Sequence, residues 1–122
     1  MPLLNEYIRQ LLPEMTQWRR DLHHYAESGW VEFRTASKVA ERLHQLGYDL
    51  TLGRDAIDAD SRMGLPDEAT LAKAFQRARE QGAPEPWLSA FEGGFTGIVA
   101  TLDTGRPGPT LAFRVDMDAL DL

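Results

Sequence analysis

The spacing of apolar side chains in the first 46 residues is the feature that most limits how this 122-residue sequence can fold. From residue 4 to residue 25 these side chains recur every three or four positions, which is the period of an amphipathic helix. Pro13 lies inside this pattern, so we expect either a kink or two helices that meet there. A second amphipathic helix is predicted over residues 35–46, with Thr35 as its N-cap and Gly47 as its stop. The fold must therefore accommodate two helices before its first strand.

Two strand patterns follow, separated by a long polar and helical segment. Residues 48–52 alternate between apolar and polar side chains and predict a short strand, and residues 95–102 predict a second one. The intervening residues, 54–94, begin as a polar loop and continue as a helix from near Pro66 to near Gly82, followed by a short helical turn. We therefore predict a helical insertion between two strands, of a kind that more often serves packing or an interface than catalysis.

The closing run, residues 110–122, has the pattern of an apolar strand that ends on two carboxylates. Alternate residues of a strand point to opposite faces. One face would carry Leu111, Phe113, Val115 and Met117, and the other Ala112, Arg114, Asp116 and Asp118. The turn-rich link at residues 103–109 predicts an antiparallel hairpin between this strand and residues 95–102. The predicted fold class is α/β, with helices packed on a mixed sheet that contains this hairpin.

Asp116 and Asp118 are the candidate site residues, because carboxylates two positions apart on a strand share a face. Their side chains would start about 6–7 Å apart. That spacing suits a metal ligand, and it equally suits an acid that orients a metal-binding histidine. The alternative is structural: the end of the strand enters solvent, where an aspartate costs little. Spacing alone leaves both interpretations open.

No other pattern in the sequence predicts a catalytic centre. His23 and His24 are neighbours on a predicted helix, so their side chains point about 100° apart and cannot easily hold one ion. His44 is expected on the polar face of the second helix. Residues 93–97 (Gly-Gly-Phe-Thr-Gly) lack the spacing of a dinucleotide or phosphate loop, which excludes a nucleotide site there. No catalytic residue is therefore assigned.

Composition excludes several classes of protein. A net charge of −6 is unfavourable for general nucleic-acid binding, which needs a basic surface. The sequence has no cysteine, so it has neither disulfides nor thiolate metal ligands. It also has no run of about 18 apolar residues and no secretory start, so we expect no membrane span and a cytoplasmic location.

Four motifs, in order along the chain, resemble a known family. They are Arg-Arg-Asp-Leu-His at residues 19–23, Glu-Ser-Gly-Trp-Val-Glu-Phe-Arg-Thr-Ala at 27–36, Thr-Gly-Ile-Val-Ala at 96–100 and Arg-Val-Asp-Met-Asp-Ala-Leu at 114–120. Together they resemble the N-terminal part of the aminoacylase/carboxypeptidase-type metallopeptidases, in the amidohydrolase branch that acts on N-acyl amino acids. Two departures bear on the first histidine pair and on the end of the chain: Tyr25 and Ala26 replace a His-Pro pair of the family, and Asp121 replaces a proline.

The resemblance implies a domain organisation. Residues 1–122 would be the N-terminal part of a catalytic α/β domain, with the helical insertion at about 54–94 and without the small dimerisation domain. The family's catalytic domain holds two divalent metal ions, manganese or zinc, on ligands that lie downstream of these motifs. In related enzymes a His-x-Asp motif lies on the closing strand; Asp116 stands at the position of its His, and Asp118 matches its Asp. The resemblance therefore implies an orienting role for Asp118 and leaves the role of Asp116 open.

The implied activity belongs to a longer protein, of which this chain would be a fragment. It is metal-dependent hydrolysis of the amide bond in an N-acyl amino acid such as p-aminobenzoyl-glutamate, and the implied partner is a second hydrolase subunit. The 122-residue chain alone is expected to bind little catalytic metal, to be inactive and to self-associate through an unpaired sheet edge. Two alternatives stay open: a small non-catalytic α/β module for binding or assembly, and a small metal-binding protein that uses Asp116 and Asp118 with a partner chain.

Overall fold

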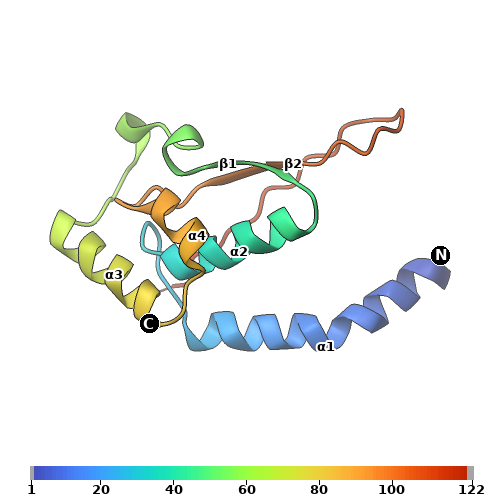
Figure 1. Cartoon of the computed structure of the whole chain (residues 1–122), viewed down its shortest axis with the longest axis horizontal. Helices are drawn as coiled ribbons and strands as arrows, with labels where there is room; N and C mark the ends of the chain where they lie inside the picture. The colour runs from blue at the N-terminus through green and yellow to red at the C-terminus, as the bar shows by residue number, and fades with distance from the viewer. Residues whose placement is uncertain (1, 121–122) are drawn as a thin grey trace.

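The computed structural model describes residues 2–120 and contains four α-helices and two β-strands within that range (Figure 1). The helices are α1 (Pro2–His24), α2 (Phe33–Gln45), α3 (Glu68–Glu80) and α4 (Glu85–Leu88). The strands are β1 (Asp49–Leu52) and β2 (Ile98–Thr101), and single-turn 3₁₀ helices form η1 (Gly53–Asp55), η2 (Ala59–Ser61) and η3 (Ser89–Phe91). The predicted α/β class is confirmed, because α2 packs against an antiparallel pair of strands.

The sheet joins two strands that are far apart in the sequence. β1 pairs with β2 in an antiparallel register that places Asp49 opposite Thr101 and Leu52 opposite Ile98. Both α3 and α4 lie in the segment that separates the two strands. Within residues 2–120 the sheet is antiparallel throughout.

The predicted hairpin between residues 95–102 and 110–122 is wrong over the part of the chain that the structure describes. Residues 110–120 form neither helix nor strand, and β2 takes β1 as its partner instead. The alternating side chains Leu111, Phe113 and Val115 are all exposed. Alternation produces a strand only where a partner strand and a covering layer are present, and within residues 2–120 neither reaches these three side chains.

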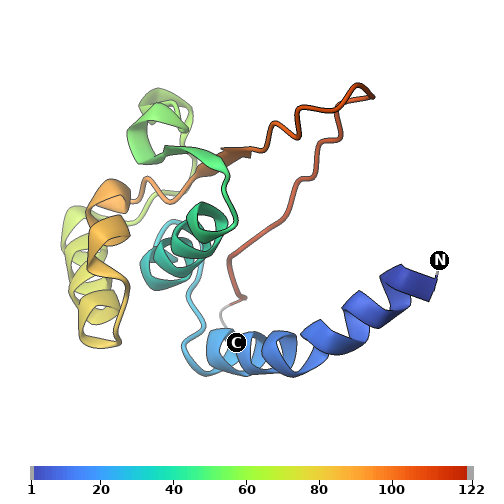
Figure 2. The ribbon, with the colours of Figure 1, turned by 45° about the vertical axis from the view of Figure 1, so that its right-hand side comes forward.

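The closing segment, defined from here on as residues 110–120, returns to the loop between α1 and α2. Figure 2 shows the chain running out beyond β2 to a tip and then back toward the C-terminal end of α1. The backbone amide of Ala119 donates a hydrogen bond to the carbonyl oxygen of Glu27 at 2.7 Å. The Met117 side chain packs against the hydrophobic core. The end of the closing segment is therefore anchored, whereas its middle is exposed.

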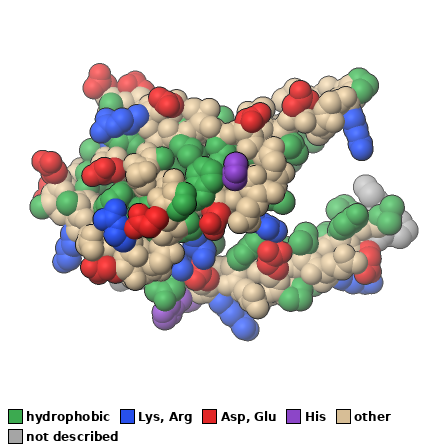
Figure 3. All heavy atoms as spheres, viewed as in Figure 1, with side chains coloured by type: hydrophobic (Ala, Val, Ile, Leu, Met, Phe, Trp, Pro, Cys, Tyr) green, Lys and Arg blue, Asp and Glu red, His purple; other side chains and the backbone are tan. Residues whose placement is uncertain are grey.

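Helix α1 runs through Pro13 without a break, and Figures 1 and 2 both show it changing direction between its ends. A proline inside a helix removes one backbone hydrogen bond and commonly causes such a bend. Much of the apolar stripe of α1 remains exposed, as the hydrophobic side chains along this helix in Figure 3 show. Although α1 has 23 residues, neither it nor any other helix in residues 2–120 is apolar enough to cross a membrane.

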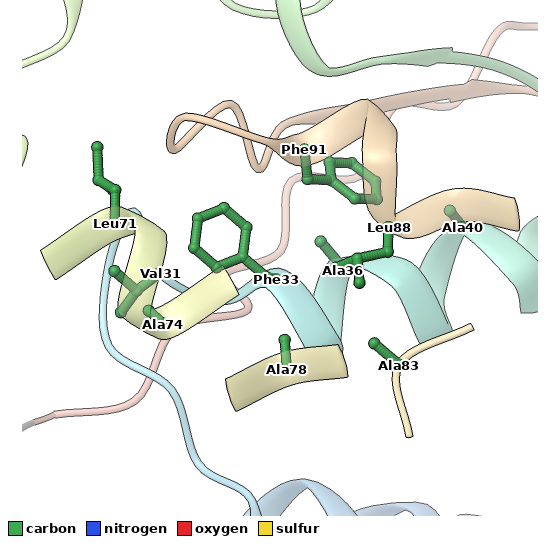
Figure 4. Packing of buried hydrophobic residues seen from close by; sticks show 10 residues of the cluster. All are labelled: Val31, Phe33, Ala36, Ala40, Leu71, Ala74, Ala78, Ala83, Leu88 and Phe91. Atoms are coloured by element: carbon green, nitrogen blue, oxygen red, sulfur yellow. The ribbon is translucent and has the colours of Figure 1, made fainter. Parts of the chain in front are cut away.

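The hydrophobic core lies between α2, α3 and the α4–η3 segment (Figure 4). Its largest fully buried apolar side chains are Phe33, Phe91 and Leu88. The other members are Val31, Ala36, Ala40, Leu71, Ala74, Ala78 and Ala83. The many alanines let the helices approach one another closely, and the aromatic rings of Phe33 and Phe75 meet edge to face with 5.3 Å between their centroids. Close packing of small side chains around a few large ones therefore holds α2 against the segment between the strands.

Gly53 brings the turn after β1 against the η3 turn. Its backbone has a φ of +61°, and a Cβ atom at this position would collide with the backbone carbonyl oxygen of Ala90. The Gly53 amide also donates a hydrogen bond to the Gly97 carbonyl oxygen at 3.0 Å. Only glycine satisfies both the left-handed backbone and the close approach. This contact holds η3 beside the end of the sheet.

Candidate functional site

The two aspartates predicted as site residues lie near the end of the closing segment. Both Asp116 and Asp118 are exposed, and Asp116 forms an ion pair with Arg114 at 2.8 Å. An ion pair between two exposed side chains contributes little to stability. The Oδ2 atom of Asp118 lies 3.6 Å from the point where a Cβ atom on Gly29 would stand. The structure thus places Asp118 over the loop that joins α1 to α2, and Asp116 in solvent.

Neither aspartate belongs to a metal centre built from the described residues. Among residues 2–120, no three histidine, aspartate or glutamate side chains converge closely enough to hold an ion. Divalent metals in proteins are held by several such ligands at once. The residues present therefore do not make up the two-metal site that the sequence resemblance implies, and no catalytic step is assigned to them.

The three histidines are distributed over two helices, and two of them pack against aromatic rings. His23 and His24 occupy the last turn of α1 and are exposed, and the His24 ring meets the Tyr25 ring edge-on at 4.5 Å. His44 lies in α2, also exposed, with its ring 5.0 Å from that of Trp87. These contacts give His24 and His44 packing roles at the surface.

A buried glutamate in the loop before α2 caps that helix. Glu27 is 3% exposed. Its Oε1 atom accepts a hydrogen bond from the backbone amide of Arg34 at 3.0 Å, and its Oε2 atom accepts one from the amide of Thr35 at 2.8 Å. The first amides of a helix have no partner inside the helix and favour a negative charge nearby. The predicted N-cap role of Thr35 is therefore wrong: α2 begins at Phe33, and Glu27 caps it from the preceding loop.

Arg34 joins three helices through a buried guanidinium group. It donates hydrogen bonds to both carboxylate oxygens of Asp21 at 2.8 Å and, through Nε, to the carbonyl oxygen of Gln81 at 2.9 Å. The group also lies over the Tyr25 ring, with 4.1 Å between the guanidinium carbon and the ring centroid. A planar guanidinium matches a carboxylate through two parallel hydrogen bonds. Arg34 therefore fixes α1, α2 and the end of α3 relative to one another.

The substitution Asp21→Asn tests the ion pair with Arg34. Hydrogen bonds from Arg34 hold the pKa of Asp21 below its usual value, although partial burial acts in the opposite direction. A carboxyl with a lowered pKa stabilises the fold above its unfolded pKa, and this contribution is lost as the pH falls through the folded pKa. We expect the variant to lose about 2 kcal/mol of unfolding free energy at pH 7, because the Arg34 charge stays buried without its carboxylate.

Urea unfolding at pH 7 and at about pH 2 measures this effect. The difference between Asp21→Asn and the parent chain should shrink at the lower pH, because protonation of Asp21 removes the charge that pairs with Arg34. The exposed Asp60 provides a matched control, since Asp60→Asn should stay within about 0.5 kcal/mol of the parent. A difference that is the same at both pH values would contradict the assigned ion pair.

A second acidic group, Glu32, lies between α2 and the end of the closing segment. Burial raises the pKa of the Glu32 carboxyl, hydrogen bonding from its own backbone and from the Thr96 side chain opposes the rise, and the charges of Asp118 and Glu27 add to it. The Oε2 atom of Glu32 is buried and has no hydrogen-bond partner among the residues that the structure describes. Three segments of the chain therefore meet at this carboxyl.

The sequence contained only an indirect signal for these buried charges. Asp21 lies in the first motif that carries the family resemblance, and Glu27, Glu32 and Arg34 lie in the second. In the sequence, both motifs indicate an enzyme family and no more than that. The structure shows that Asp21, Glu27 and Arg34 hold the loop and α2 in place, which residue type alone does not reveal because such side chains are usually exposed.

Known proteins share both the sequence and the fold of this chain. It is 97% identical over 122 residues to indole-3-acetyl-aspartic acid hydrolase from Enterobacter agglomerans, and 70% identical over 122 residues to a p-aminobenzoyl-glutamate hydrolase subunit from Escherichia coli (strain K12). The predicted resemblance to the amidohydrolases is confirmed. A crystal structure of aminobenzoyl-glutamate utilization protein from Klebsiella pneumoniae matches 97% of the chain with a TM-score of 0.94 and 81% identity. No family model matches the chain.

The match covers only part of each similar protein. The chain spans 28% of the length of either hydrolase and 30% of the crystallised chain. Most of the sequence of each hydrolase therefore has no counterpart here.

Proposed function

We propose that the chain is part of a metal-dependent amidohydrolase that cleaves the amide bond of an N-acyl amino acid. The observation that carries this proposal is the 97% and 70% identity, over the whole chain, to two hydrolases named for such substrates. Indole-3-acetyl-aspartate and p-aminobenzoyl-glutamate share an aromatic acyl group joined through an amide to an acidic amino acid. This shared chemistry defines the substrate class, with p-aminobenzoyl-glutamate as the first substrate to test.

Residues 1–122 supply the N-terminal part of the catalytic domain in this proposal, with the helical insertion at about 54–94. The anchoring of Ala119 on Glu27 supports an orienting role for the neighbouring Asp118, because the anchor fixes its backbone while its carboxylate stays exposed. A divalent metal, manganese or zinc, would be held by ligands outside this chain, and when bound it would supply activation of water and polarisation of the amide carbonyl. Asp116 receives no role, since it lies in solvent beside Arg114.

A second hydrolase subunit is the proposed partner. The Escherichia coli relative is itself named as one subunit of its hydrolase, which supports an assembly of different chains. Exposed apolar side chains on α1, including Leu4, Ile8 and Leu11, support an interface on that helix. The same side chains support self-association of the 122-residue chain when it is alone in solution. A cytoplasmic location completes the proposal and agrees with the absence of cysteine.

Transfer of the chain into the Escherichia coli relative tests this function. The matched region of that relative is replaced by residues 1–122, and the chimera is assayed with manganese or zinc on p-aminobenzoyl-glutamate and on indole-3-acetyl-aspartate. We expect kcat/KM within about tenfold of the relative on at least one substrate. The 122-residue chain alone should show no turnover above a metal-only blank, because it lacks a complete set of metal ligands among residues 2–120.

A substitution in the same chimera tests the orienting role of Asp118. In the chimera, Asp118→Ala should lower kcat/KM by about 10–100-fold, the usual cost of losing a group that orients a metal ligand. Asp60→Ala, at an exposed aspartate of η2, should leave kcat/KM unchanged. A folded chimera that hydrolyses neither substrate with either metal would refute the proposed function.

A further inference from the structure

Three chain segments meet at the end of the closing segment, and two of them carry acidic side chains. The Ala119 amide is bound to the Glu27 carbonyl oxygen at 2.7 Å, and the Asp118 carboxylate lies over Gly29. Thr96, just before β2, is buried beside Glu32. A backbone hydrogen bond thus seats Asp118 on the loop, where its charge acts on the Glu32 carboxyl.

The charges that face Glu32 are both negative. They are Asp118 from the closing segment and Glu27 from the loop, while Thr96 contributes a neutral hydroxyl. The guanidinium group of Arg34, two positions along the chain, is bound to Asp21 and to the Gln81 carbonyl oxygen. A charged carboxylate oxygen that is buried without a partner is costly, and Oε2 of Glu32 is such an atom among residues 2–120. This environment favours the neutral carboxyl.

We propose that Glu32 is a positioning residue for Asp118. While Glu32 carries its proton, it allows the Asp118–Ala119 end of the closing segment to rest on the loop. When the proton is lost, the Glu32 carboxylate repels that end. The proton is placed on Oε2, the buried oxygen that has no partner among residues 2–120, and the Asp118 carboxylate is assigned as its acceptor. On losing the proton to solvent, Glu32 becomes a third negative charge in the cluster. The consequence for catalysis, a pH-dependent placement of Asp118, rests on the proposed function.

The direction of the pH dependence follows from burial. Burial raises the pKa of Glu32 above its unfolded value. The favourable contribution of the neutral carboxyl is therefore complete below the unfolded pKa and is lost as the pH rises through the folded pKa. The end of the closing segment should be held most firmly in acid and loosen toward neutral pH.

Hydrogen exchange of the Ala119 amide in the 122-residue chain tests the proposal. NMR measures its protection from about pH 4 to about pH 8, corrected for intrinsic exchange, with the Ala40 amide in α2 as the reference for global opening. Across this range Ala119 should lose about two- to fivefold of its protection, the scale of a partly exposed charge interaction. Glu32→Gln has nearly the same shape and no charge, so it should keep the acidic level of protection throughout. Glu80→Gln, at an exposed glutamate of α3, should behave as the parent chain does.

Glu32→Ala separates positioning from simple packing. It should remove the pH dependence but give less protection than Glu32→Gln, since alanine offers Asp118 no hydrogen-bond donor. Protection of Ala119 that does not vary with pH in the parent chain would overturn the proposal, as would a pH dependence that persists in Glu32→Gln. Equal protection in the alanine and glutamine variants would overturn the contact assigned to Asp118. This measurement does not involve hydrolysis. A negative hydrogen-exchange result therefore does not refute the proposed function, and an inactive chimera does not refute the role of Glu32.

Discussion

The variant Phe33→Ala is expected to lose about 3–5 kcal/mol of unfolding free energy. The Phe33 ring is fully buried between α2 and α3 and meets the Phe75 ring edge to face. Its removal takes away apolar burial and leaves a cavity that the surrounding helices fill only in part. Because small domains have total stabilities of about 5–15 kcal/mol, this is a large share of the whole. Urea unfolding followed by circular dichroism measures the change.

Phe113→Ala is a matched control on the same chain. Phe113 is 87% exposed in the closing segment, so the same loss of a ring should change the unfolding free energy by less than about 0.5 kcal/mol. The contrast between the two phenylalanines is the decisive result. Equal losses in both variants would mean that the closing segment is packed in the folded chain, against the exposure described above.

The variant Glu27→Ala is expected to lose about 2–4 kcal/mol of unfolding free energy. The substitution leaves the backbone amides of Arg34 and Thr35, which Glu27 binds at 3.0 and 2.8 Å, without an acceptor at a buried position. A buried donor without a partner costs more than the net value of the hydrogen bond that it had made. Hydrogen exchange of the Thr35 amide should also become faster, because the first turn of α2 opens more easily.

Glu27→Gln and Glu80→Ala are the controls for this cap. Glutamine keeps the shape and one acceptor oxygen but not the charge, so its loss should be smaller, about 1–2 kcal/mol. Glu80 is exposed near the end of α3, and its replacement by alanine should change the unfolding free energy by less than about 0.5 kcal/mol. A Thr35 exchange rate that Glu27→Ala leaves unchanged would show that another group caps α2.

The helices and strands with local signals were predictable from the sequence. Helix α3 begins after Asp67, whose side chain accepts a hydrogen bond from the Thr70 amide at 2.7 Å, and it ends before Gly82, which has a φ of +80°. Both signals lie within the few residues that they control. β1 and β2 likewise fall inside the runs 48–52 and 95–102 that predicted strands. The α/β class follows from these elements alone.

The strand pairing could not be predicted in the same way. The short link at residues 103–109 favoured a hairpin, but β2 pairs with β1, which precedes the whole segment 53–97. The alternation of apolar and polar side chains in residues 110–120 indicates that one face of this segment is suited to burial. It does not indicate which part of a protein covers that face. Pairing depends on contacts between residues that are distant in the sequence, and no local pattern records them.

The candidate site was predicted only in part. Asp118 was predicted as a candidate site residue, and the structure places its carboxylate against Gly29 of the α1–α2 loop. The roles of Glu27 and Arg34 and the partial burial of Glu32 were missed, because they arise from contacts with other segments. As residue types, all three are usually exposed, and only the packed structure distinguishes them from charged residues in solvent.

The long segment between β1 and β2 also bears on how freely this chain can change. Its contributions to the core are Leu71, Ala74, Ala78, Ala83, Leu88 and Phe91. They pack against Phe33, Ala36 and Ala40 of α2, so neither set is buried without the other. Excising the segment, or exchanging it for an unrelated one, would uncover the inner face of α2 and require new side chains there. The segment between β1 and β2 and helix α2 should therefore change together in evolution. A change in the length of one requires a compensating change in the sequence of the other.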